Sequence, residues 1–149
     1  MMFEETIGQL HTELELRNEG YVQRFETGLS QVIASNDSAC IGPLLLLLDD
    51  EEEHDELMFS IVHAIERFDD ATYVRAIIGS LHLLVEQAPR WGTVLHMRIL
   101  NSPSAMSEYG EVVKSLPPEQ REGVRKILES VRRRNSKFEA LCNAILSSL

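Results

Sequence analysis

Apolar residues recur at every third or fourth position along almost the whole chain. Ile7, Leu10 and Leu14 show this spacing near the start, and Ile61 and Ile65 show it further along. The period matches the turn of an α-helix, whereas a half-buried strand would alternate apolar and polar residues. No stretch of four or more positions alternates cleanly in that way. We therefore expect helices throughout and no strands.

Residues that break or cap helices divide this pattern into eight or nine segments. Pro89, Pro103 and Pro118 each stand where a helix would begin, which suits proline because the first turn does not need its missing N–H. Since the leucines from Leu44 to Leu48 leave no polar face, we expect their helix to be covered on nearly all sides. The expected helices span residues 3–17, 21–35, 41–48, 55–68, 70–87, 89–101, 103–116 and 118–146, the last divided by a break at Asn135 and Ser136 if there are nine.

Short connections between helices of this length favour an all-α domain of stacked antiparallel helices. With 149 residues, the chain has the length of one domain, so residues 1–149 are expected to fold together. We favour an irregular α-solenoid of the HEAT-like type. Because no fixed sequence period is visible, a compact helical bundle stays open as the alternative.

The acidic residues are unevenly placed. Residues 1–56 hold fourteen acidic and two basic side chains, so they carry a net charge of −12, whereas the remaining 93 residues carry +2. A nucleic-acid-binding protein needs a basic face that displaces counterions from phosphates. We therefore do not expect direct binding to nucleic acid, and the oligomeric state is left open.

The cysteine content and the start of the chain favour a cytoplasmic protein. Cys40 and Cys142 are too few and too far apart to suggest a disulfide framework or a zinc site. The chain opens on Phe3, Glu4 and Glu5 instead of the basic and apolar regions of a signal peptide. No apolar run approaches the roughly twenty residues of a membrane span, so no membrane partner is expected.

No group of residues predicts catalysis. His63 and Glu66 have the i, i+3 spacing of two ligands on one helical face, but a single pair falls short of the di-iron pattern of helical bundles. Phosphate-binding glycine motifs and nucleophile motifs are both absent. We expect no enzyme, no cofactor and no metal site, although a metal-dependent enzyme remains a third hypothesis, which elemental analysis would test.

Seven of eight consecutive residues are acidic in the segment between the third and fourth expected helices. These are Asp49, Asp50, Glu51, Glu52, Glu53, Asp55 and Glu56. One interpretation is a solvated loop whose last members complement a helix dipole. The other is an electrostatic surface for a basic partner, since crowded like charges repel one another. On the second interpretation, replacing Asp50 to Glu53 by Asn and Gln should slow association with the partner and flatten its salt dependence, while leaving the thermal stability nearly unchanged.

Residues 44–101 resemble the immunity protein 30 family of bacterial polymorphic toxin systems. The resemblance rests on Leu44 to Asp50, Leu57 to Phe68, Tyr73, Ala88-Pro89-Arg90-Trp91 and His96 to Asn101, taken in this order and spacing. It implies a small helical protein that binds and neutralises a toxin domain, and it implies no catalytic residues. Its motif positions His63, Glu66, Trp91, Arg98 and Asn101 are compatible with structural roles as well as functional ones. For Trp91 we expect a buried anchor at a helix start.

Together these observations predict an immunity protein that binds a cognate toxin domain with a basic surface. The resemblance implies a contact-dependent growth inhibition effector or a related one, and the acidity favours a toxin of the nuclease type, such as an RNase or tRNase. The acidic segment is the predicted binding face. Arg132, Arg133 and Arg134 are expected to form a solvated helix face or to pair with the acidic first third. The alternative function is a HEAT-like scaffold or adaptor that binds a cellular protein.

Overall fold

The computed structural model describes residues 2–149, of which Met2 only by its backbone, and all regular structure in this range is helical. The α-helices are α1 (Met2–Leu16), α2 (Tyr21–Ala34), α3 (Ile41–Leu45), α4 (Asp55–Ile65), α5 (Asp70–Gln87), α6 (Pro89–Leu100), α7 (Pro103–Lys114), α8 (Pro118–Arg134) and α9 (Glu139–Ser147). Two short 3₁₀ helices, Ser38–Cys40 and Ser136–Phe138, precede α3 and α9. The predicted all-α class of stacked antiparallel helices is confirmed.

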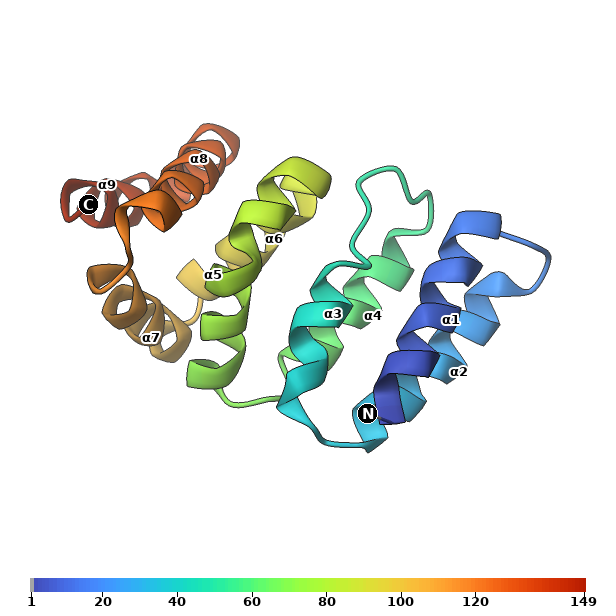
Figure 1. The fold of residues 1–149 in the computed structure, drawn as a ribbon. Coiled ribbons are helices and arrows are strands. Elements are labelled where there is room, and N and C mark those ends of the chain that lie inside the picture. The colour runs from blue at the N-terminus through green and yellow to red at the C-terminus, as the bar shows by residue number, and fades with distance from the viewer. Residues whose placement is uncertain (1) are drawn as a thin grey trace.

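From α1 to α6, successive pairs of helices form antiparallel hairpins, and these hairpins stand side by side (Figure 1). α1 packs on α2, α3 on α4 and α5 on α6, while α2 also packs on α4 and α3 on α5. α7 and α8 both pack against the α5/α6 hairpin, and α9 packs on α8 at the far end. The molecule is therefore a row of hairpins that begins with α1 and α2 and ends with α8 and α9.

One continuous apolar core runs along this row, and each helix contributes its three-and-four-spaced residues to it. In α2, for instance, Phe25, Leu29 and Val32 are all buried. Close packing needs a small residue at one place, because a Cβ on Gly28 would lie 2.6 Å from a methyl group of Leu10. No helix within residues 2–149 has both the length and the apolar character that crossing a membrane requires.

The predicted helix starts and the predicted break in the last segment are present. Ser102 caps α7 by accepting a hydrogen bond from the Ala105 backbone N–H. The backbone of Asn135 is extended and its side chain accepts from the Lys137 N–H, so α8 ends there. The chain then turns through a 3₁₀ helix into α9, which is the ninth helix.

The leucine run departs from its expected structure, because α3 ends at Leu45 instead of continuing to Leu48. The N–H groups of Leu47 and Leu48 bond to carbonyls three residues back, which tightens the turn and takes the chain out of the helix. Leu46 is consequently 37% exposed, although the other four leucines are buried. α4 likewise ends early, at Ile65 instead of Phe68, in turns of the same kind.

Candidate functional site

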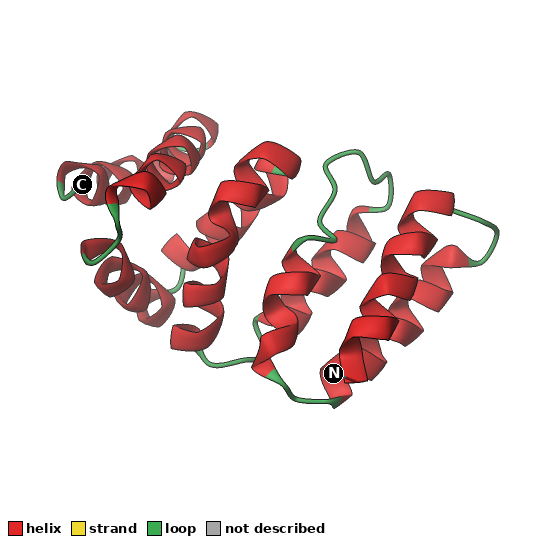
Figure 2. Cartoon of the chain, viewed as in Figure 1, coloured by secondary structure: helices red, strands yellow, loops and turns green. Residues whose placement is uncertain are grey.

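The acidic segment, residues 49–56, lies at the edge of the molecule where three hairpin connections meet. The α1–α2, α3–α4 and α5–α6 connections all lie at the upper edge in Figure 1. The α3–α4 connection, residues 46–54, is the longest one within residues 2–149 and arches over this edge (Figure 2). The segment can therefore contact the hairpins on both sides of its own.

Asp50 caps the start of a helix to which it does not belong. Its two carboxylate oxygens accept hydrogen bonds from the backbone N–H groups of Arg90, at 2.9 Å, and Trp91, at 3.2 Å. These groups lie in the first turn of α6, where no helical carbonyl can reach them. The residue in the cap position itself is Ala88, which has no side chain that could accept such a bond. Asp50, which is 40 residues before Arg90 in the chain, thus supplies the acceptor oxygens that the Ala88 side chain lacks.

Glu52 is buried in the same edge, with 3% of its surface exposed. One carboxylate oxygen accepts hydrogen bonds from the Tyr21 hydroxyl and from the His54 backbone N–H, both at 3.0 Å. The other oxygen lies 3.5 Å from Arg17 Nε and accepts no hydrogen bond within the described residues. Burial and the nearby Glu52 carboxylate raise the pKa of the Tyr21 hydroxyl to about 12, so this hydroxyl remains a donor at any physiological pH.

Two more acids of the segment hold basic side chains of the neighbouring hairpins. Asp49 accepts from the Arg17 guanidinium at 3.4 Å, and its other oxygen accepts from the Glu51 N–H at 2.9 Å. Asp55 accepts from the Arg90 guanidinium at 3.2 Å. Arg17 follows directly after α1 and has a positive φ of 50°. The segment therefore joins the α1/α2, α3/α4 and α5/α6 hairpins.

The remaining three acids face solvent. Glu51 is exposed, and the side chains of Glu53 and Glu56 are 75% and 66% exposed, with only His54 of the same segment at 3.3–3.4 Å from them. The seven predicted site residues thus divide into four that bind the protein itself and three that point outward. The stability of a variant neutralised from Asp50 to Glu53 stays a prediction, and the capping contacts of Asp50 and the buried contacts of Glu52 argue against an unchanged stability.

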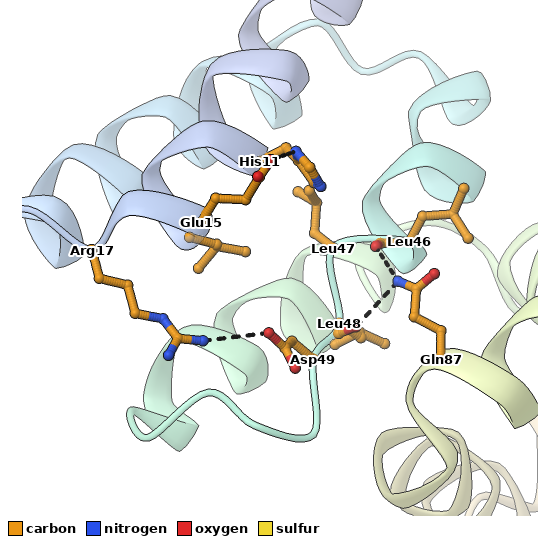
Figure 3. A pocket seen from close by; sticks show the side chains of 9 residues that line it. His11, Glu15, Arg17, Leu46, Leu47, Leu48, Asp49 and Gln87 are labelled. Atoms are coloured by element: carbon orange, nitrogen blue, oxygen red, sulfur yellow. Dashed lines mark hydrogen bonds and ion pairs between the residues drawn. The ribbon is translucent and has the colours of Figure 1, made fainter.

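A groove of about 400 Å³ lies beside the segment, between α1 and the end of the leucine run (Figure 3). His11 and Glu15 of α1 form one wall, and Gln87 of α5 stands on the opposite side. The Gln87 amide donates to the carbonyl oxygen of Leu46 at 2.6 Å, which fixes this side of the groove. Arg17 and Asp49 meet at one end of the groove.

Among the family-motif positions, Glu66 and Arg98 bind each other. The Arg98 guanidinium donates two hydrogen bonds of 2.7 Å to the two oxygens of Glu66, which joins the end of α4 to α6. Asn101 accepts from the Lys137 ammonium group at 2.9 Å. Both contacts hold helices together, so these three motif residues have structural partners.

The other two motif positions differ from each other in exposure. Trp91 is 1% exposed and packs edge-on against Phe59 at 5.0 Å between ring centroids, which confirms the predicted buried anchor. His63 is exposed, with its ring 6.1 Å from that of Phe59, and Glu66 is engaged by Arg98 instead. In the described part of the chain, no group of three or more His, Cys, Asp or Glu side chains is placed to bind a metal ion.

The basic run at the end of α8 does not reach the acidic first third. Arg132 donates to Asn143 of α9 at 2.7 Å, and α8 lies at the opposite end of the row from α1 and α2 (Figure 1). Cys40 and Cys142 are both free and buried.

Arg17, Tyr21 and Arg90, which bind the acidic segment, and Gln87, which binds the leucine run before it, could not be identified from the sequence. These contacts join positions 31 to 41 residues apart, and helical periodicity carries no information at that range. One signal was available, since the Ala88 side chain before Pro89 cannot cap a helix, so the N–H groups of the first turn need an acceptor from elsewhere.

Fold and site together define an acidic all-α protein of stacked hairpins, and its most acidic segment contacts three of these hairpins. A family model described as immunity protein 30 matches residues 12–109, and the chain belongs to this family. The match begins within α1 and so extends beyond the expected residues 44–101 in both directions. No curated protein and no solved structure is significantly similar to the chain.

Proposed function

We propose that this protein binds a cognate toxin domain in the cytoplasm and neutralises it as a stoichiometric inhibitor. Its family implies an immunity protein against a toxin. The toxin of this proposal is a nuclease delivered by a contact-dependent growth inhibition system or a related one. A nuclease needs a basic cleft to hold phosphates, and a carboxylate surface can occupy such a cleft in place of the nucleic acid.

The observation that carries the proposal is that some acids of the segment bind the protein itself while others face solvent. Asp50 and Glu52 hold its backbone in place, so Glu51, Glu53 and Glu56 extend from a fixed support. Because the backbone of the segment is already ordered, it loses little conformational freedom on binding. Opposite charge on the partner also raises the rate of encounter, which matters for a protein that must act before its cell is damaged.

Growth rescue with the toxin domain encoded beside this gene tests the function. Cells that express the toxin domain should grow only when the protein is co-expressed, and the two should purify as a complex. Cells left unprotected would contradict the proposal.

A charge-neutral triple variant, Glu51→Gln with Glu53→Gln and Glu56→Gln, tests the surface. It should associate with the toxin domain about tenfold more slowly and with a weaker salt dependence, because steering by opposite charge is lost. Unfolding in urea should be unaffected. The matched control changes Glu119, Glu129 and Glu139 to Gln, which alters the net charge equally on exposed positions of α8 and α9. Equal association rates for the two triple variants would place the interface elsewhere.

A further inference from the structure

The groove beside the acidic segment combines an apolar floor with a charged rim. Leu14 of α1 and Leu47 of the leucine run contribute apolar surface to it, 7% and 4% of each residue being exposed, and Leu48 beside them is fully buried. Glu15 stands on the wall with 62% of its side chain exposed, and Asp49 lies at one end. Lysine and arginine fit such a site, since they lay their methylene stems on apolar surface and keep the charged head at its edge.

The opposite wall of the groove is held in place in the free protein. Gln87 donates to the Leu46 carbonyl, so the leucine run cannot move towards α1 without breaking this bond. The chain's own Arg17 shows which chemistry the end of the groove attracts, because its guanidinium lies there within 3.5 Å of carboxylate oxygens of Asp49 and Glu52. Among the described residues, the basic side chain paired with the Glu15 carboxylate is His11, at 2.7 Å.

We propose that the groove between α1 and residues 46–49 receives a lysine or arginine side chain of the toxin domain, with its stem on the leucines and its charge at Glu15. This inference rests on the proposed function and adds a specific anchor to it. The outward acids Glu51, Glu53 and Glu56 attract the partner from a distance, whereas the groove holds one of its side chains after contact. A buried anchor of this kind contributes mainly to the lifetime of a complex, and surface charges contribute mainly to the rate of its formation.

The first test changes the charge at Glu15 by two substitutions and measures binding to the toxin domain encoded beside this gene. Glu15→Gln should weaken the complex severalfold, and Glu15→Lys should weaken it by at least about tenfold, or ~1.4 kcal/mol, because the new cation takes the place of the partner's. The matched controls are Glu111→Gln and Glu111→Lys on α7. Glu111 is similarly exposed, at 69%, and like Glu15 it pairs within its own helix, with Lys114.

The second test fills the groove with a larger side chain and leaves the formal charge unchanged. His11→Trp should raise the dissociation rate about tenfold, whereas His82→Trp at an exposed position of α5 should leave it unchanged. If the Glu15 and His11 variants bind as tightly as their controls while the wild-type complex forms, the groove assignment is overturned and the proposed function stands. If the wild-type protein does not bind the toxin domain at all, both proposals fail.

Discussion

At the scale of single residues, His96 is the buried titratable group with the clearest consequence for stability. Its side chain is fully buried in α6, with its ring edge-on to Tyr109 at 5.2 Å. Nδ1 lies 2.8 Å from the Gly92 carbonyl oxygen, which can only accept, so Nδ1 carries the proton of the neutral ring. Burial lowers the pKa of His96 to about 4, because the charged form would lose its hydration.

The depressed pKa predicts a loss of stability in acid. The unfolded chain takes up a proton on this histidine near its ordinary pKa of about 6.5, whereas the folded protein resists until about pH 4. The contribution of the neutral ring is therefore complete above pH 6.5 and decreases by about 3 kcal/mol as the pH falls to 4. Urea unfolding at a series of pH values should show this slope in the wild type and a shallower one in His96→Gln. Identical slopes would mean that His96 binds its proton as readily in the folded protein as in the unfolded chain.

How well single residues could be predicted depended on whether their role is local. The burial of Trp91 could be predicted because large aromatic side chains dominate the packing of apolar cores. The burial of Glu52 could not, since it rests on Tyr21 and Arg17 from another hairpin, and acidic residues are rarely buried without such partners. The same argument applies to Glu66, whose partner Arg98 lies 32 positions away.

At the scale of elements, α6 depends on a residue outside itself. Its first turn presents the Arg90 and Trp91 N–H groups to Asp50, and the carboxylate also complements the positive end of the helix. This contact fixes α6 to the α3–α4 connection. Because α6 also packs on α5, α7 and α8, its position affects half of the molecule.

Removing the Asp50 carboxylate should therefore destabilise the protein. Asp50→Ala should lower the free energy of unfolding by about 1 kcal/mol, the usual effect of losing a helix cap. Asp50→Asn should lose less, because asparagine caps helices nearly as well as aspartate. The control is Glu51→Ala, whose carboxylate is exposed and bonds to nothing within the described residues. Urea midpoints for the three variants measure the difference, and equal midpoints for Asp50→Ala and Glu51→Ala would refute the cap.

Most helices could be predicted from the sequence because periodicity and caps are local signals. Pro103 and Ser102 mark the start of α7, and Asn135 marks the end of α8, in the positions expected. The end of α3 could not be predicted, since nothing in five identical leucines distinguishes Leu45 from Leu48. The surroundings of the run decide it, and Gln87 of α5 holds the Leu46 carbonyl that the helix leaves free.

At the scale of the whole molecule, the family match ends earlier in the chain than the apolar core does. The match ends at residue 109, within α7, whereas the core continues through α8. Val124, Ile127, Leu128 and Val131 of α8 are each at most 2% exposed. Ile127 lies so close to α6 that a Cβ on Gly92 would be 3.1 Å from its end, and Ser130 shares a hydrogen bond with Thr93. The α5/α6 hairpin that holds the acidic segment is thus itself supported by residues beyond the match.

A chain that ends after Leu116 should therefore fail to fold cooperatively. Burying an aliphatic side chain contributes about 1.5–3 kcal/mol, so losing four of them from α8 removes an amount comparable with the whole stability of a typical domain. The control ends after Arg134 and lacks only the Ser136–Phe138 turn and α9, which packs chiefly on α8. It should stay folded with a lower melting temperature. Thermal melts followed by circular dichroism distinguish the two chains, and a cooperative transition in residues 1–116 would show that the first seven helices form a core without α8.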